Sequence, residues 1–286
     1  MDVLGQVFGS RRLRPALSPP PAVSAFRRHV SLTLELAVTQ FRLRYTGSVL
    51  GYAWSLLRPF FLFGINYIVF IYVLKVGGKE FGTQLLVGIV AWTFFAEGTG
   101  AALTSIASNG HLLRKAAFPR VVLVVASMLT ALFTFLINLS LVVVVTTALG
   151  HMHLSVRSLW AVPLLAELAL LATGIGLLLS ALFVFYRDVG HLWEIFSQLL
   201  FYASAIVFPF SFLLRGRVLP HIVGANPVAQ VIEDLRRALV IDDPTVPWTA
   251  SVDGILFVIP LALVGGILLG GWLAFRKLAP SFAESM

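Results

Sequence analysis

The sequence contains no cysteine, and only 12% of its 286 residues are charged. Without cysteine, the chain cannot form disulfides, thiolate metal sites or thiol nucleophiles. A soluble domain carries about 25% charged residues, and half of that charge does not cover the surface of a water-soluble protein. The composition therefore argues against a soluble enzyme. With 58% hydrophobic residues, a net charge of +8 suits anionic lipid better than nucleic acid.

The common motifs of nucleotide and metal enzymes are also missing from the sequence. A P-loop requires GxxxxGK[ST] to hold phosphates, whereas Gly78-Lys79 is followed by Glu80. HExxH is absent, and a loop and a turn explain His151-Met152-His153 and Asp242-Asp243 better than a metal site does. We predict that this chain is not an enzyme and holds neither a metal nor a cofactor of its own.

Six apolar segments are candidates for crossing a bilayer, which takes about 20 mostly apolar residues. Backbone groups in lipid must be hydrogen-bonded within the segment, so each segment is expected to be a helix. The first becomes long enough if Arg58 extends to the lipid headgroups. The chain is thus predicted to be an all-α polytopic membrane protein with spans at 54–74, 83–106, 121–148, 161–185, 193–213 and 253–275.

Six spans place both termini on one side of the membrane. Of the 21 lysines and arginines, 14 fall on the side of the termini and 7 on the other, which predicts cytoplasmic termini by the positive-inside rule. Residues 1–28 are then expected to be a disordered cytoplasmic tail, and 29–286 the transmembrane domain. Within that domain, 107–120 would be a cytoplasmic loop and 215–250 an outer loop.

Two further helices are expected outside the spans. Apolar residues at helical spacing predict an amphipathic helix in the cytoplasmic interface before the first span: Val30, Leu34, Val38, Phe41 and Tyr45. It is either a membrane anchor or a gate, and as a gate or interface element it would use Arg42, Arg44, Tyr45 and Trp54.

The second helix lies in the outer loop. Asn226 is a good N-cap and Pro227 suits the first helical position. An apolar stripe follows over 228–239, and Asp242-Asp243-Pro244 ends the pattern. At about 13 residues this helix is too short to span, so we expect a re-entrant or outer-interface helix.

Two acids and a glycine pair stand out inside the spans. Glu97 and Glu167 are candidates for a proton relay, but we favour a position near a helix end for Glu97 and near the wet outer surface for Glu167. Gly266 and Gly270 form GxxxG, which permits close helix contact. That contact would lie either within one subunit or between two.

The loop 107–120 has an apolar face with a basic rim. This pattern suits a short helix that docks on a cytoplasmic partner, while the simpler alternative is a basic loop that only fixes topology. The candidate coupling residues are His111, Leu112, Leu113, Arg114, Lys115, Phe118, Pro119 and Arg120, joined by Arg187 and Asp188 in the turn 186–191, for which a purely structural turn is the default.

Residues 42–60, RLRYTGSVLGYAWSLLRPF, resemble the membrane subunit of ABC-2 type exporters for bacterial polysaccharides. The entry pattern of that family is matched by Arg44, Tyr45, Ser48, Leu50, Gly51, Trp54 and Pro59. Many relatives have Asn where Arg58 stands. Supporting matches in the same order lie at 113–115, 118–120, 186–189, 226–227 and 275–284.

This resemblance implies a homodimer of six-span subunits in the bacterial inner membrane, joined to two copies of a separate ATPase that binds ATP and Mg. It implies export of a polyprenyl-diphosphate-linked glycan such as O-antigen. An ABC-2 exporter of drugs or small lipids is the alternative, and a secondary transporter is less well supported because no inverted repeat is visible. Aromatic side chains that either stack on sugars or pack against lipid and helices are Tyr67, Tyr72, Phe201, Tyr202 and Phe208.

Overall fold

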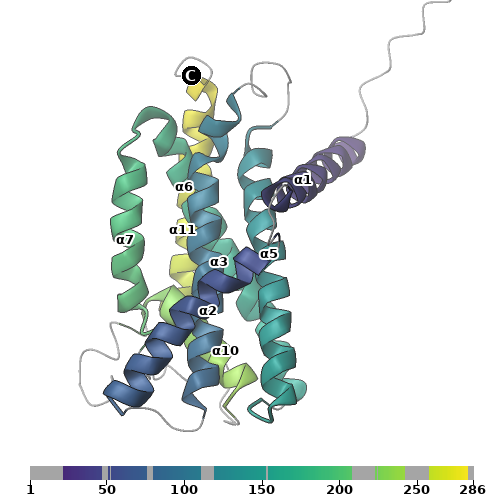
Figure 1. Cartoon of the computed structure of the whole chain (residues 1–286). Helices are drawn as coiled ribbons and strands as arrows, with labels where there is room; N and C mark the ends of the chain where they lie inside the picture. Colours follow the sequence, from purple (N-terminus) through teal and green to yellow (C-terminus); the bar gives the residue numbers. More distant parts are fainter. Residues whose placement is uncertain are drawn as a thin grey trace, which may run out of the picture.

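The computed structural model describes residues 22–46, 51, 53–75, 80–110, 119–152, 154–207, 223, 225–241 and 258–282. These residues form eight α-helices, and none of them lies in a strand. Most of the long helices run side by side in a bundle (Figure 1). The helices are α1 (Ala22–Tyr45), α2 (Ala53–Ile68), α3 (Phe81–Ser108), α5 (Val121–Ala148), α6 (Ala161–Phe185), α7 (Val189–Ala203), α10 (Pro227–Leu239) and α11 (Val258–Leu278).

Five helical stretches are long and apolar enough to cross a membrane: 53–73, 81–108, 121–148, 156–185 and 258–281. A π-helical turn, Val69–Val73, extends α2, and a 3-10 helix, Val156–Trp160, precedes α6. The five stretches correspond to the first, second, third, fourth and sixth predicted spans. Apolar runs of this length therefore form the expected helices.

The predicted span over 193–213 is not confirmed. The helix there, α7, has 15 residues and ends at Ala203, where a turn begins. Ala205 adopts a positive φ of 52°, a left-handed conformation that cannot continue an α-helix. The predicted break at Phe208-Pro209-Phe210 lies outside the described residues, and the helix has already ended before it.

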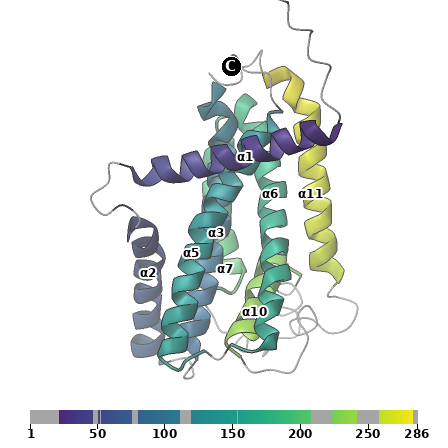
Figure 2. The same ribbon diagram turned by 90° about the vertical axis from the view of Figure 1, so that its right-hand side faces the viewer.

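The amphipathic N-terminal helix starts earlier than expected. α1 begins at Ala22, so the boundary predicted at residue 28 falls inside this helix. Figure 2 shows α1 lying across the bundle, near the end where the C-terminus lies. The Thr130 hydroxyl of α5 donates to the backbone carbonyl of Ala37 at 3.1 Å and ties α1 to the bundle.

The core is centred on α3, which packs against both α5 and α6. Glycines allow the closest approaches. A Cβ on Gly176 of α6 would lie 2.7 Å from Ala102 Cβ of α3 and from Met128 Cε of α5. Gly271 of α11 sits against the carbonyl oxygen of Gly174 in α6. The close contact of α11 within this chain therefore uses Gly271, while a Cβ on Gly266 or Gly270 would meet nothing within 4 Å.

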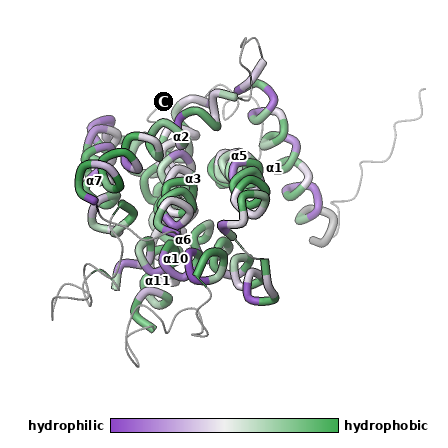
Figure 3. Tube along the Cα trace, turned by 60° about the horizontal axis from the view of Figure 1, so that its bottom comes forward, coloured by the Kyte–Doolittle hydropathy of each residue, from purple (hydrophilic) through white to green (hydrophobic). Residues whose placement is uncertain are grey.

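The short helix α10 starts as predicted, and it is largely buried within the bundle. Asn226 is its N-cap and accepts from the Val228 amide at 3.0 Å, with Pro227 at the first position. Its polar residues Gln230, Glu233, Asp234 and Arg236 are all buried. Figure 3 shows hydrophilic stretches of α10 among α3, α6 and α11, so this helix packs inside the bundle on both of its faces.

Candidate functional site

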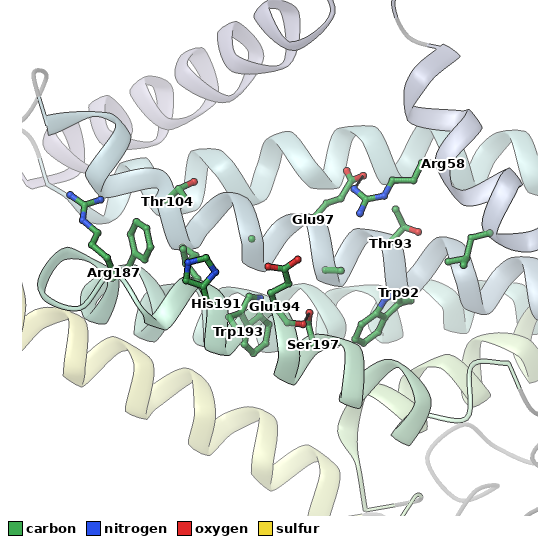
Figure 4. Close-up of a pocket in the computed structure, with 16 residues that line it drawn as sticks. Arg58, Trp92, Thr93, Glu97, Thr104, Arg187, His191, Trp193, Glu194 and Ser197 are labelled. Atoms are coloured by element: carbon green, nitrogen blue, oxygen red, sulfur yellow. Dashed lines mark hydrogen bonds and ion pairs between the residues drawn. The ribbon is translucent and has the colours of Figure 1, made fainter.

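A cavity of about 650 Å³ lies between α2, α3 and α7 (Figure 4). One face of α3 supplies Thr93, Glu97, Gly100 and Thr104 at helical spacing. The facing side of α7 supplies His191, Trp193, Glu194 and Ser197. Polar and charged side chains thus line a hollow beside helices whose other faces are apolar.

Aromatic contacts hold α7 beside α3 and so define this cavity. The ring centroids of Trp92 and Phe201 are 5.5 Å apart, and those of Phe95 and Trp193 are 6.3 Å apart. Aromatic pairs at such distances add stability beyond the area that they bury. The opposite side of α7 exposes large apolar residues, which are Leu192, Ile195, Phe196 and Leu199. The helix is therefore polar toward the cavity and apolar away from it.

Glu97 lies near the middle of α3 and faces two arginines from other helices. Its carboxylate is 3.5 Å from Arg44 Nη1 of α1 and 3.8 Å from Arg58 Nη1 of α2. The prediction that Glu97 sits near a helix end is therefore wrong. A carboxylate at membrane depth is costly unless it is paired or hydrated, and here the two guanidinium groups flank it.

A second hollow, of about 560 Å³, adjoins the first and shares Arg58 and Glu97 with it. Its other lining residues include Arg44, Tyr45, Gly51 and Trp54. These four belong to the RYxxSxLGxxWxxxxP pattern, and Gly51 has a positive φ of 48° in the connection between α1 and α2. Residues that are spread along 42–60 in the sequence are thus brought to one wall.

The gate candidates are anchored to neighbouring helices. The Tyr45 hydroxyl lies 3.3 Å from the Thr134 hydroxyl of α5, and the Asn138 side-chain amide of α5 donates to the Ser55 carbonyl of α2 at 3.3 Å. Arg42 is exposed on α1, away from this hollow. The structure therefore groups Arg44, Tyr45 and Trp54, but not Arg42, around Glu97. Their role as a gate stays a prediction.

Most of the predicted coupling residues, 111–118, lie outside the described residues. On their C-terminal flank, the Arg120 guanidinium stacks 5.7 Å from the ring centroid of Phe282. Arg187 stacks at 5.1 Å on Phe183 and also lines the cavity. The Asp188 carbonyl accepts from the Leu192 amide in the first turn of α7. Their role in coupling is untested.

The five candidate channel aromatics do not form one cluster. Tyr67 of α2 faces Gly82 of α3, whose Cβ would lie 2.9 Å from the tyrosine ring. Tyr72 and Tyr202 are exposed, while Phe201 is buried against Trp92. Phe208 lies outside the described residues. Whether these rings contact a substrate stays a prediction.

The sequence analysis singled out Arg58, Glu97 and Arg187, but it did not place them with Thr93, Thr104, His191, Glu194 and Ser197 in one cavity. Thr93, Glu97, Gly100 and Thr104 recur at intervals of three or four along an otherwise apolar span, and this spacing was a usable signal. Glu167 was expected to be wet, but it is buried in α6. Among the described residues, no three His, Asp or Glu side chains are placed to hold a metal ion.

Comparison with known proteins gives a consistent family match. The model of the ABC-2 type transporter family matches residues 32–240. An O-antigen export system permease protein RfbA from Klebsiella pneumoniae is 27% identical over 248 residues, which is 85% of this chain and 90% of that protein. A protein of the same name from Myxococcus xanthus is 26% identical over 70% of this chain and 77% of its own length.

Proposed function

Because the chain belongs to the ABC-2 type transporter family, we propose that it is the membrane subunit of an ATP-driven exporter of a polyprenyl-diphosphate-linked polysaccharide. The export would run from the cytoplasm across the inner membrane. The observation that carries the proposal is the similarity to an O-antigen export permease along 85% of the chain. The pattern at residues 44–59 supports the same substrate class.

The cavity between α2, α3 and α7 is the part of the chain that suits a glycan path. Sugar hydroxyls bond to carboxylates and hydroxyl groups, and sugar faces stack on aromatic rings. Glu97, Glu194, Ser197 and Trp193 offer these groups on its wall. A charged groove is unfavourable against lipid, which supports a wet path that a second copy of the chain completes.

Energy would come from a separate ATPase, present in two copies, which binds ATP and Mg. The absence of a P-loop motif from the sequence fits this division of labour. Loop 107–120 would dock on the ATPase, and both termini would lie in the cytoplasm. The outer loop 215–250, including α10, would face the opposite side.

Deletion of the gene in the source organism tests the substrate class. We expect polyprenyl-linked glycan to accumulate inside the cell and surface glycan to disappear, with restoration by the wild-type gene. Unchanged surface glycan together with lost efflux of a drug or small lipid would favour the alternative exporter. Export that persists without any ABC ATPase would favour a secondary transporter.

A variant pair tests the cavity as the path. Gly100 lines both hollows, and a Cβ there would meet nothing within 4 Å, so the side chain of Gly100→Leu would start in open space and narrow the cavity. We expect it to reduce glycan export. Gly265→Leu adds the same side chain to α11 at another open glycine, outside the residues that line the cavity. Equal export by the two variants at matched membrane levels would place the path elsewhere.

A further inference from the structure

Arg236 of α10 is a buried cation whose hydrogen bonds reach two other parts of the bundle. Its Nε donates to the carbonyl of Gln84 in α3 at 2.9 Å. Its Nη1 donates to the Ala205 carbonyl at 3.3 Å, and its Nη2 donates to the Ile206 carbonyl. The side chain is 5% exposed. One planar guanidinium group therefore links α10, α3 and the turn that ends α7.

Arg236 supplies hydrogen-bond donors to buried carbonyl groups at the end of α7. The last carbonyls of a helix and of the turn that follows it have no partner within the helix, and leaving them buried and unbonded costs free energy. α7 ends inside the bundle, at buried residues 204–207. Arginine presents five donors in a fixed fork, so a single side chain can serve several carbonyls at once.

A neighbouring carboxylate balances the charge of Arg236, and a glycine leaves room for its side chain. The Glu233 carboxylate lies 3.5 Å from Arg236 Nη1 and balances the buried charge. Position 88 of α3 is glycine, and a Cβ there would lie 2.6 Å from Arg236 Nη2. A second bond supports the same junction, because the Asn226 side-chain amide donates to the Ser204 hydroxyl at 2.9 Å.

We propose that Arg236 is a positioning residue that fastens the end of α7 to α3 and thereby sets the width of the cavity at that end. The cavity wall of α7 reaches Ser197, and α7 ends two turns later. Because Arg236 of α10 donates to the Ala205 and Ile206 carbonyls, it ties the turn after α7 to α10. Separation of this turn from α3 requires loss of the bond between Arg236 and the Gln84 carbonyl, or of the bonds to the turn.

The fastening is tested with a single reporter thiol. Val207 is buried beside Ile206, and the chain has no native cysteine, so Val207→Cys supplies one buried thiol. Its reaction with N-ethylmaleimide in native membranes is followed by mass spectrometry. We expect slow labelling in the otherwise unchanged chain, and labelling faster by about tenfold or more when the turn opens locally.

Three changes are compared in this background. Arg236→Lys keeps the charge but replaces the fork with one ammonium group, and Gly88→Ala displaces the guanidinium without removing it. Both are expected to speed labelling. Arg237→Ala is the matched control, since Arg237 is the next residue on α10 and its Nε lies 3.5 Å from the same Glu233; it should leave the rate near that of the unchanged background. The proposal is overturned if the thiol in Arg236→Lys is labelled no faster than in the unchanged background. It is also overturned if the thiol in Arg237→Ala is labelled as fast as in Arg236→Lys.

The consequence for transport rests on the proposed function and is measured separately. The quantity measured is the amount of ATP hydrolysed per glycan exported, in complexes whose membrane subunit lacks the reporter thiol. Complexes with Arg236→Lys should have a higher ratio than wild type, and complexes with Arg237→Ala should keep the wild-type ratio. Fast labelling with a wild-type ratio would overturn the role in positioning the path. Absence of glycan export by the wild-type complex would instead overturn the proposed function and leave the labelling result standing.

Discussion

Glu97 lines both the cavity and the hollow that adjoins it, and its two arginine partners differ in exposure. The Arg44 side chain is 37% exposed and that of Arg58 is 79% exposed. An exposed ion pair contributes about 0–1 kcal/mol, because water screens the charges and long side chains lose entropy. The pair with Arg44 should therefore be the stronger of the two.

A double-mutant cycle tests this order. We expect Glu97→Gln and Arg44→Gln to show a coupling free energy of about 0.5–1 kcal/mol in thermal unfolding of the detergent-purified protein. The cycle of Glu97→Gln with Arg58→Gln is the internal control and should give a smaller coupling. Additive effects in the Arg44 cycle would mean that the contact has no energetic role.

Residues with local partners were predictable from the sequence, and residues with distant partners were not. The cap of α10 depends on Asn226 and Val228, two residues apart, and it forms as predicted. No partner was predicted for Arg236, whose carbonyl partners lie 30 and 152 residues away along the chain. The helical spacing of apolar and polar residues shows which side chains share a face of the helix. It does not show which other elements pack on that face.

At the scale of elements, hydropathy predicted five helices well and the sixth poorly. An uncharged run predicted 121–148, and a run interrupted only by Glu167 predicted 161–185; α5 and α6 have these same bounds. The run at Ile195–Leu214 is equally uncharged, yet α7 ends at Ala203. The left-handed Ala205 ends the helix, and its carbonyl is paired by a residue from a later helix. A hydropathy window contains no information on that partner.

The glycine contact between α6 and α11 gives a prediction about packing. A Cβ on Gly174 would lie 2.7 Å from the Cα of Leu268, which is backbone and cannot turn aside. Gly174→Ala should therefore lower the free energy of unfolding by about 1–3 kcal/mol, as overpacking does. Unfolding of the purified protein in mixed micelles measures this change.

The matched control for this contact is Gly270→Ala, which adds the same methyl group to α11 where no atom lies within 4 Å. Its effect should stay within about 0.5 kcal/mol. If the control is as destabilising as Gly174→Ala, the face that carries Gly266 and Gly270 is covered in the assembled protein. The same measurement therefore reports on contacts between subunits.

On the scale of the whole molecule, burial is uneven across the candidate spans. The most apolar window of α3 has 72% of its residues buried, against 11% for the stretch 53–73 and 22% for 258–281. In lipid, the hydrophobic effect does not drive exposed apolar helix faces together. The exposed faces of α2 and α11 can therefore contact either lipid or another chain. The cavity lies beside α2, at this loosely packed edge.

Assembly with the proposed ATPase gives the last prediction, which concerns loop 107–120. The two flanks of the loop are fixed, because the Asn109 side-chain amide donates to the Ser105 carbonyl at 2.8 Å and Arg120 stacks on Phe282. If the loop docks through an apolar face, burial of Leu113 is worth about 1.5–3 kcal/mol. Lys115 at the rim would give about 0–1 kcal/mol.

Leu113→Asp should therefore reduce export and co-purification of the ATPase more than Lys115→Ala does, at matched membrane levels. A loop that only fixes topology would give the opposite order, because the lysine carries the positive-inside signal and the leucine carries none. Both variants should insert, since neither change falls within a predicted span. Wild-type export and complex recovery for Leu113→Asp would show that the loop acts on topology alone.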